Sequence, residues 1–68
     1  MKLTIAIDRE VDGRWIAEVP DLNVLLYGDS KVDAIERAQS AARGILLDRI
    51  AQGELPPDYS TAVFNIAA

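Results

Sequence analysis

The chain has 68 residues, no cysteine, no histidine and a formal net charge of −4. A domain this small buries only about 60% of the surface that its unfolded chain exposes, so its core is marginal and support from a partner chain is expected. The absence of thiols and imidazoles excludes a disulfide framework and the usual zinc sites. The acidic balance and the scattered single basic residues are also unlike the charge pattern of a surface that binds duplex nucleic acid.

Apolar runs in the sequence are short. The longest, residues 24–27, falls far below the roughly 20 residues that span a bilayer, and the N-terminus has no basic-then-apolar signal pattern. We therefore expect a single domain over residues 1–68 that is cytoplasmic and does not bind a membrane.

The first half of the chain predicts three strands. Residues 1–7 alternate large apolar side chains with smaller or polar ones, which is the period of a half-buried strand. Residues 8–13 are polar and end in the turn dipeptide Asp-Gly, so the chain is expected to reverse there into a second strand over residues 14–19. Pro20 ends that strand because it has no N–H for a ladder. A third short strand is expected over residues 24–27.

The second half predicts one helix and a fourth strand. Ser30 and Asp33 resemble a capping box with aspartate in place of glutamate, and they predict a helix over residues 31–52. Gly53 is placed where a left-handed C-cap residue belongs, and residues 60–67 are expected to form the last strand. The apolar residues that share an arc of about 120° on this helix are Ala34, Ile35, Ala38, Ala42, Ile45 and Leu46.

The order β-β-β-α-β predicts an α+β fold with sheet order 3-2-1-4 and the helix on one face. The residues expected beneath the helix are Leu3, Ile5, Ile7, Trp15, Ala17 and Val19. The opposite face, with Thr4, Ala6, Ile16 and Glu18, is expected to have no cover within this chain, and strands three and four are expected to be open edges.

No residue pattern indicates catalysis, a cofactor or a metal ion. Asp8, Glu10 and Asp12 form the only local acidic cluster, and a solvated hairpin loop explains it better than an acid/base or metal site does. The serines have no histidine to activate them. We therefore assign no catalytic, cofactor-binding or metal-binding residue and expect no enzymatic activity.

One stripe of the expected helix points away from the sheet. Ser40, Gly44, Leu47 and Ala51 lie at the spacing of a contact stripe, although a mid-helix glycine costs about 1 kcal/mol relative to alanine. The stripe is either a contact with a second copy, as a homo-dimer or higher oligomer, or a tolerated glycine beside a single exposed leucine. Arg49 falls within the apolar arc, where its stem can pack while its head reaches water.

Residues 12–22, Asp-Gly-Arg-Trp-Ile-Ala-Glu-Val-Pro-Asp-Leu, followed by Tyr27-Gly28-Asp29-Ser30 and then Ala34, resemble the HicB-type antitoxin family. The similarity covers nearly the whole chain and implies a partial RNase-H-like fold. It further implies that the protein binds and neutralises a HicA-type toxin, a small basic ribonuclease that degrades messenger RNA. Family members usually have Leu-Pro-Gly where this chain has Leu22-Asn23.

Many members of that family continue into a C-terminal DNA-binding module. This chain ends before such a module could start, so no direct DNA binding by the chain is expected.

The resemblance and the charge together suggest candidate toxin contacts at Arg14, Ile16, Glu18 and Asp21, because an acidic antitoxin suits a basic partner. Two other functions stay open. One is a stand-alone homo-oligomeric scaffold of the same fold without a toxin. The other is an RNA-processing enzyme or RNA binder, which is disfavoured because Glu18 and Asp8 would repel phosphates and because such catalysis needs several carboxylates converging on Mg²⁺.

Overall fold

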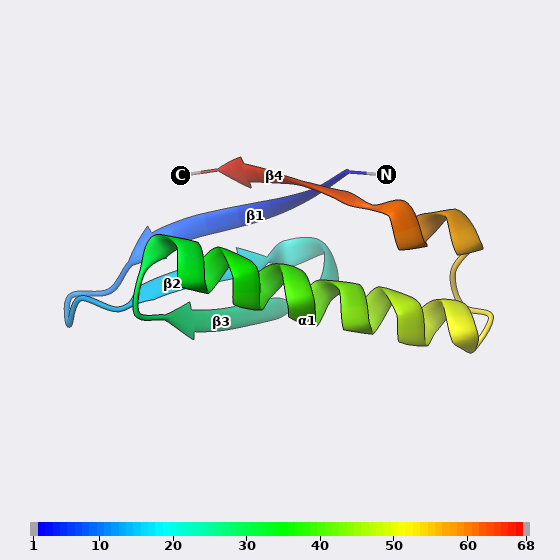
Figure 1. Cartoon of the computed structure of the whole chain (residues 1–68), viewed down its shortest axis with the longest axis horizontal. Coiled ribbons are helices and arrows are strands. Elements are labelled where there is room, and N and C mark those ends of the chain that lie inside the picture. Colours follow the sequence, from blue (N-terminus) through cyan, green and yellow to red (C-terminus); the bar gives the residue numbers. More distant parts are fainter. Residues whose placement is uncertain (1, 68) are drawn as a thin grey trace.

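A computed structural model describes residues 2–67 as one four-stranded sheet with a single long helix on one side (Figure 1). The elements in chain order are β1 (Lys2–Arg9), β2 (Trp15–Val19), a 3-10 turn η1 (Pro20–Leu22), β3 (Val24–Gly28), α1 (Lys31–Ala51), a 3-10 turn η2 (Pro57–Thr61) and β4 (Val63–Ala67). The sheet order is β3-β2-β1-β4, with β4 parallel to β1 and the other pairs antiparallel. The predicted α+β class and the 3-2-1-4 order are confirmed.

The first hairpin is longer than the sequence predicted. β1 extends to Arg9, so Asp8 and Arg9, expected in the loop, instead pair with Ile16 and Trp15. The polarity of both side chains misled the assignment, because exposed strand positions near a turn accept charged residues. The turn itself is closed by backbone hydrogen bonds from Glu10 N–H to Arg14 O (2.8 Å) and from Gly13 N–H to Glu10 O (3.0 Å). β2 begins at Trp15, so Arg14, which was expected to start the second strand, lies before it. Met1, expected in the first strand, lies outside the described residues.

The start of the fourth strand was predicted too early. Ser60 and Thr61 belong to η2, and β4 begins at Val63. A proline occupies the start of η2, where its fixed φ suits a helical turn, and the Tyr59 N–H donates to Pro56 O (3.1 Å). The turn carries Tyr59 against the core before the chain joins β1.

The connection between β2 and β3 is η1 followed by a single left-handed residue. Asn23 has φ 58° and ψ 41°, and its N–H donates to Pro20 O (3.2 Å). Asparagine tolerates this conformation better than most residues other than glycine. Leu22 and Asn23 thus complete the reversal without the Leu-Pro-Gly sequence that is usual in the family that the chain resembles.

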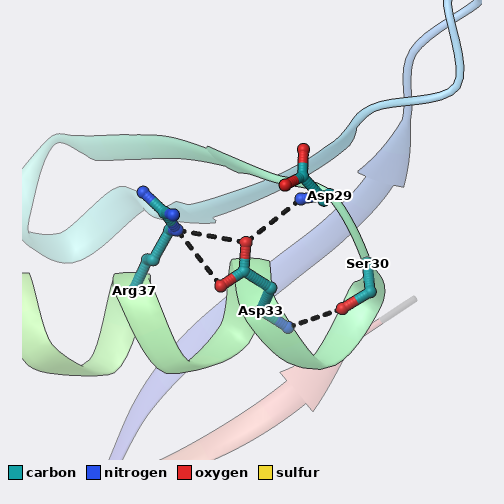
Figure 2. Close-up of polar contacts among 4 residues, drawn as sticks. All are labelled: Asp29, Ser30, Asp33 and Arg37. Atoms are coloured by element: carbon teal, nitrogen blue, oxygen red, sulfur yellow. Dashed lines mark hydrogen bonds and ion pairs between the residues drawn. The ribbon is translucent and has the colours of Figure 1, made fainter.

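The helix begins at the predicted cap, and Figure 2 shows its polar contacts. Ser30 Oγ accepts a hydrogen bond from the Asp33 N–H (3.0 Å), while the Asp33 carboxylate accepts from the Asp29 N–H (3.1 Å) and from Arg37 Nε (3.1 Å). The Asp29 N–H, followed by the Arg37 guanidinium, lowers the pKa of Asp33 below its ordinary 3.8. The carboxylate reaches back to residue 29, one position beyond the N–H that a capping box normally engages.

The helix ends one residue earlier than predicted, with Gln52 as its cap. Gly53 has φ 76°, and hydrogen bonds from Gly53 N–H to Ile50 O (3.0 Å) and from Glu54 N–H to Arg49 O (2.8 Å) form a Schellman motif. The predicted left-handed glycine is confirmed.

Small residues bring α1 close to the sheet. Ala34, Ala38 and Ala42 are fully buried, and Leu46 continues the same row. At the end of β3, a Cβ added to Gly28 would lie 2.7 Å from the Ala34 Cα, so only glycine allows this approach. As Figure 1 shows, α1 lies mainly over β3 and β2 rather than over β4.

Trp15 was expected beneath the helix, and the register does place it on that face. It is only half-buried, at the rim, where the Arg9 guanidinium lies 5.4 Å from the ring centroid. The largest fully buried side chains are Leu3, Ile5, Leu46 and Val19. The core is therefore aliphatic, and within residues 2–67 no helix is long and apolar enough to cross a membrane.

Candidate partner-binding surface

The sheet face opposite α1 has no element packed against it in residues 2–67 (Figure 1). We call it the open face. The strand registers assign to it Lys2, Thr4, Ala6, Asp8, Ile16, Glu18, Leu25, Tyr27, Val63, Asn65 and Ala67. None of these residues is buried, whereas the alternate positions of β1 supply Leu3, Ile5 and Ile7 to the core.

Large apolar side chains are exposed on the open face. Leu25, Tyr27 and Val63 keep 48%, 42% and 52% of their surface accessible. Ile16 is partly exposed beside Leu25 and Tyr27, whereas Val63 lies apart from them on β4, opposite Lys2. A shallow hollow of about 470 Å³ lies over β1, β2 and β3. Its lining includes the apolar Ile16 and Leu25 and the acidic Asp8 and Glu18. Apolar surface ringed by polar groups is typical of a protein-binding patch.

Arg14 extends this surface at the hairpin end. Its guanidinium lies 4.4 Å above the centre of the Tyr27 ring, and its Nε donates to Asp12 Oδ2 (2.9 Å). The Arg14 backbone N–H also donates to Asp12 Oδ1 (3.1 Å), and this bond, followed by the side-chain contact, lowers the pKa of Asp12 below 3.8. Arg14 is thus held over the face by an aromatic ring and a carboxylate, both outside the core.

The structure brings together three of the four residues suggested as toxin contacts and separates the fourth. Ile16 and Glu18 share the open face, and Arg14 covers its edge. Asp21 lies in η1 and lines a different cavity, beside the C-terminal half of α1.

Sequence reasoning missed Leu25 and Tyr27, two of the large exposed apolar side chains of the open face. Their alternation with the half-buried Val24 and Leu26 was available, but a run of four apolar residues does not by itself say which pair faces the core. The pairing of Ile16 with Tyr27 and of Glu18 with Leu25 decides it.

The helix stripe suggested as an oligomer contact is exposed along its whole length. Ser40, Gly44, Leu47 and Ala51 all lie on the outer side of α1, and Leu47 keeps 55% of its surface accessible. A Cβ added to Gly44 would meet nothing within 4 Å, so no contact within residues 2–67 requires a glycine there. The contact with a second copy stays a prediction.

Among the described residues, no group of three or more acidic, histidine or cysteine side chains is placed to hold a metal ion. The acidic cluster near the hairpin is divided: Asp8 lies in β1 and accepts the Arg9 N–H (2.8 Å), while Asp12 pairs with Arg14 in the turn. Two of its three carboxylates, those of Asp8 and Asp12, therefore have local structural partners.

Comparisons with protein-family models, with curated proteins and with solved structures found no match to this chain.

Proposed function

We propose that this chain is an antitoxin of the HicB type, which binds a small basic ribonuclease and covers the surface that receives RNA. The observation that carries the proposal is the open face, where the exposed Leu25 and Tyr27 lie beside Ile16 and the acidic Asp8 and Glu18. The resemblance of residues 12–34 to the HicB pattern supplies the identity of the partner. The partial RNase-H-like identity of the fold belongs to the same proposal.

Electrostatics supports a basic partner. The chain carries a net charge of −4, and opposite charges accelerate encounter, while buried apolar contacts set the lifetime of a complex. A basic protein that binds messenger RNA in the cytoplasm fits the first requirement, and the exposed apolar side chains of the open face supply this chain's part of the second. Inhibition is then a masking effect with one antitoxin site per toxin, and no bond in the toxin is made or broken.

The small hydrophobic core and the two unpaired sheet edges support the proposal that the chain also forms a homo-oligomer. Strands β3 and β4 end the sheet on its two sides, and neither edge carries a proline or a charged residue that would discourage pairing. A dimer through an edge or through the outer stripe of α1 leaves the open face free for the toxin.

Two leucines offer a matched test. Leu25 on the open face and Leu47 on the outer side of α1 are similarly exposed, at 48% and 55%. The proposal requires a small basic ribonuclease partner. That protein would be purified and its RNA cleavage titrated with wild type, Leu25→Arg and Leu47→Arg. We expect Leu25→Arg to weaken inhibition about tenfold or more, because it places a cation against a basic partner inside the apolar patch.

Leu47→Arg should inhibit like wild type, and light scattering on the same samples reports whether it alters the oligomer. Glu18→Lys should slow association and change its salt dependence. Equal loss with both leucine variants would reject the open face as the docking surface. Time-dependent, substoichiometric inactivation would indicate an enzyme, and no binding at all would favour the homo-oligomeric scaffold.

A further inference from the structure

A second cavity lies at the end of the molecule where α1 finishes, away from the open face. Its volume is about 320 Å³, within the size range of small-molecule sites. Four leucines from four different segments form its apolar wall, namely Leu3, Leu22, Leu46 and Leu55, with Tyr59 beside them. The cavity is thus built where β1, η1, α1 and η2 meet.

Three charged side chains line the same cavity. Lys2 and Arg49 are cationic and Asp21 is anionic, which leaves a net charge of +1 within a chain whose overall charge is −4. Within residues 2–67 no nitrogen of either cation lies within 4.0 Å of a carboxylate oxygen, so no ion pair among these residues cancels the positive charge.

Arg49 differs from the other arginines. Arg14 and Arg37 pair with carboxylates, and Arg9 and Arg43 lie over aromatic rings. Within residues 2–67 the half-buried Arg49 side chain has no ion pair, hydrogen bond or aromatic partner, although it lies in the wall of an apolar cavity. A partly desolvated guanidinium gains most from a carboxylate, which it can bind through two parallel hydrogen bonds.

We propose that this cavity binds a small amphipathic carboxylate. The carboxylate pairs with Arg49, with Lys2 as a second cation at the rim, and the hydrocarbon part packs on Leu22, Leu46 and Leu55. Asp21 faces the same space and weakens the binding of any anion. Apart from Lys2, which the register also assigns to the open face, the residues of this site lie outside that face, and the site does not depend on the toxin proposal.

The test is an NMR titration of the ¹⁵N-labelled full chain with octanoate and, separately, with octan-1-ol, which has a similar tail and no charge. Octanoate should shift the amides of Leu22, Leu46 and Leu55, and octan-1-ol should bind at least about tenfold more weakly, as expected for loss of a charge-assisted contact.

Three variants assign the contact. Arg49→Gln should weaken octanoate binding about tenfold, whereas the matched Arg43→Gln, on the same helix but outside the cavity, should leave it within about twofold. Asp21→Asn should strengthen binding, because it removes a like charge. Should Arg49→Gln fail to fold, Asp21→Asn and the neutral alcohol still test the site.

Equal binding of octanoate and octan-1-ol, equal effects of the two arginine variants, or shifts that map elsewhere would each overturn the proposal. In that case Arg49 only extends its head to water at the end of the helix.

Discussion

The two faces of the sheet are made from alternate residues of the same strands, yet their side chains differ sharply in how far they are buried. On the helix side, Leu3, Ile5 and Val19 are almost fully buried under α1. On the open face, Ile16, Leu25 and Tyr27 are also large and mainly apolar, but they stay partly exposed. Burial here depends on whether a second layer exists. The helix-side residues therefore serve stability, and the apolar residues of the open face remain available for a partner.

The first prediction concerns the close packing of α1 on the sheet. Gly28→Ala places a methyl group against the Ala34 backbone, where neither strand nor helix can shift cheaply. We expect a loss of about 3 kcal/mol or more, enough to unfold so small a domain, measured by thermal melting followed by circular dichroism.

Gly44→Ala is the matched control, since its new methyl group meets nothing within 4 Å. It should stabilise the protein by about 0.5–1 kcal/mol through helix propensity. A Gly28→Ala protein that melts like wild type would contradict the close approach of α1 to β3.

The second prediction compares one isoleucine from each face. Ile5 is fully buried and Ile16 is half-buried on the open face. Ile5→Ala should lower the free energy of unfolding by about 3 kcal/mol, because it loses buried area and leaves a cavity, and Ile16→Ala by about 1 kcal/mol or less. Denaturant unfolding of the two variants measures the difference. Similar losses would mean that the open face is covered in solution. If a second copy of the chain supplies the cover, the loss for Ile16→Ala should become smaller on dilution, while the loss for Ile5→Ala should not.

Trp15 tests how far the covered region extends. Because the ring is half-buried at the rim, Trp15→Ala should cost about 1–2 kcal/mol, less than a core aromatic would. Urea unfolding followed by circular dichroism suits this variant, which has no other tryptophan to report fluorescence. A loss as large as that of Ile5→Ala would show that the helix reaches further along the strands than the structure has it.

The smallest effect concerns the start of the covering helix. Asp33 has a lowered pKa in the folded protein, so its contribution to stability is fully present above pH 3.8 and is lost as the pH falls through the lower folded value. Asp33→Asn should therefore reduce the dependence of the unfolding free energy on pH in this acidic range. Chemical unfolding at a series of pH values measures the slope, and an unchanged slope would mean that the Asp29 and Arg37 contacts do not persist in solution.

Several features of the fold could be read from the sequence because they rest on local chemistry. The Ser30 cap, the left-handed Gly53 and the alternation of Leu3, Ile5 and Ile7 each depend on residues within a few positions of one another. Once these elements were assigned, the right-handed crossover and the hairpins led to the observed order of the strands.

The boundaries at Arg9 and Val63 were missed for a physical reason. Pairing with a neighbouring strand extended β1 despite its charged residues, and a proline-initiated turn replaced the expected start of β4.

The two candidate sites, the open face and the cavity beside Arg49, show most clearly which features can be predicted from the sequence and which need the folded structure. The alternation of strand residues, the lack of thiol and imidazole chemistry and the acidic charge all follow from the amino-acid sequence alone. The folded arrangement was needed to show that Leu25 and Tyr27 join Ile16 and Glu18. It was also needed to show that Asp21 lies with Lys2 and Arg49 around a second cavity. Strand register and helix placement join residues far apart in the chain, and no local pattern encodes such long-range pairing.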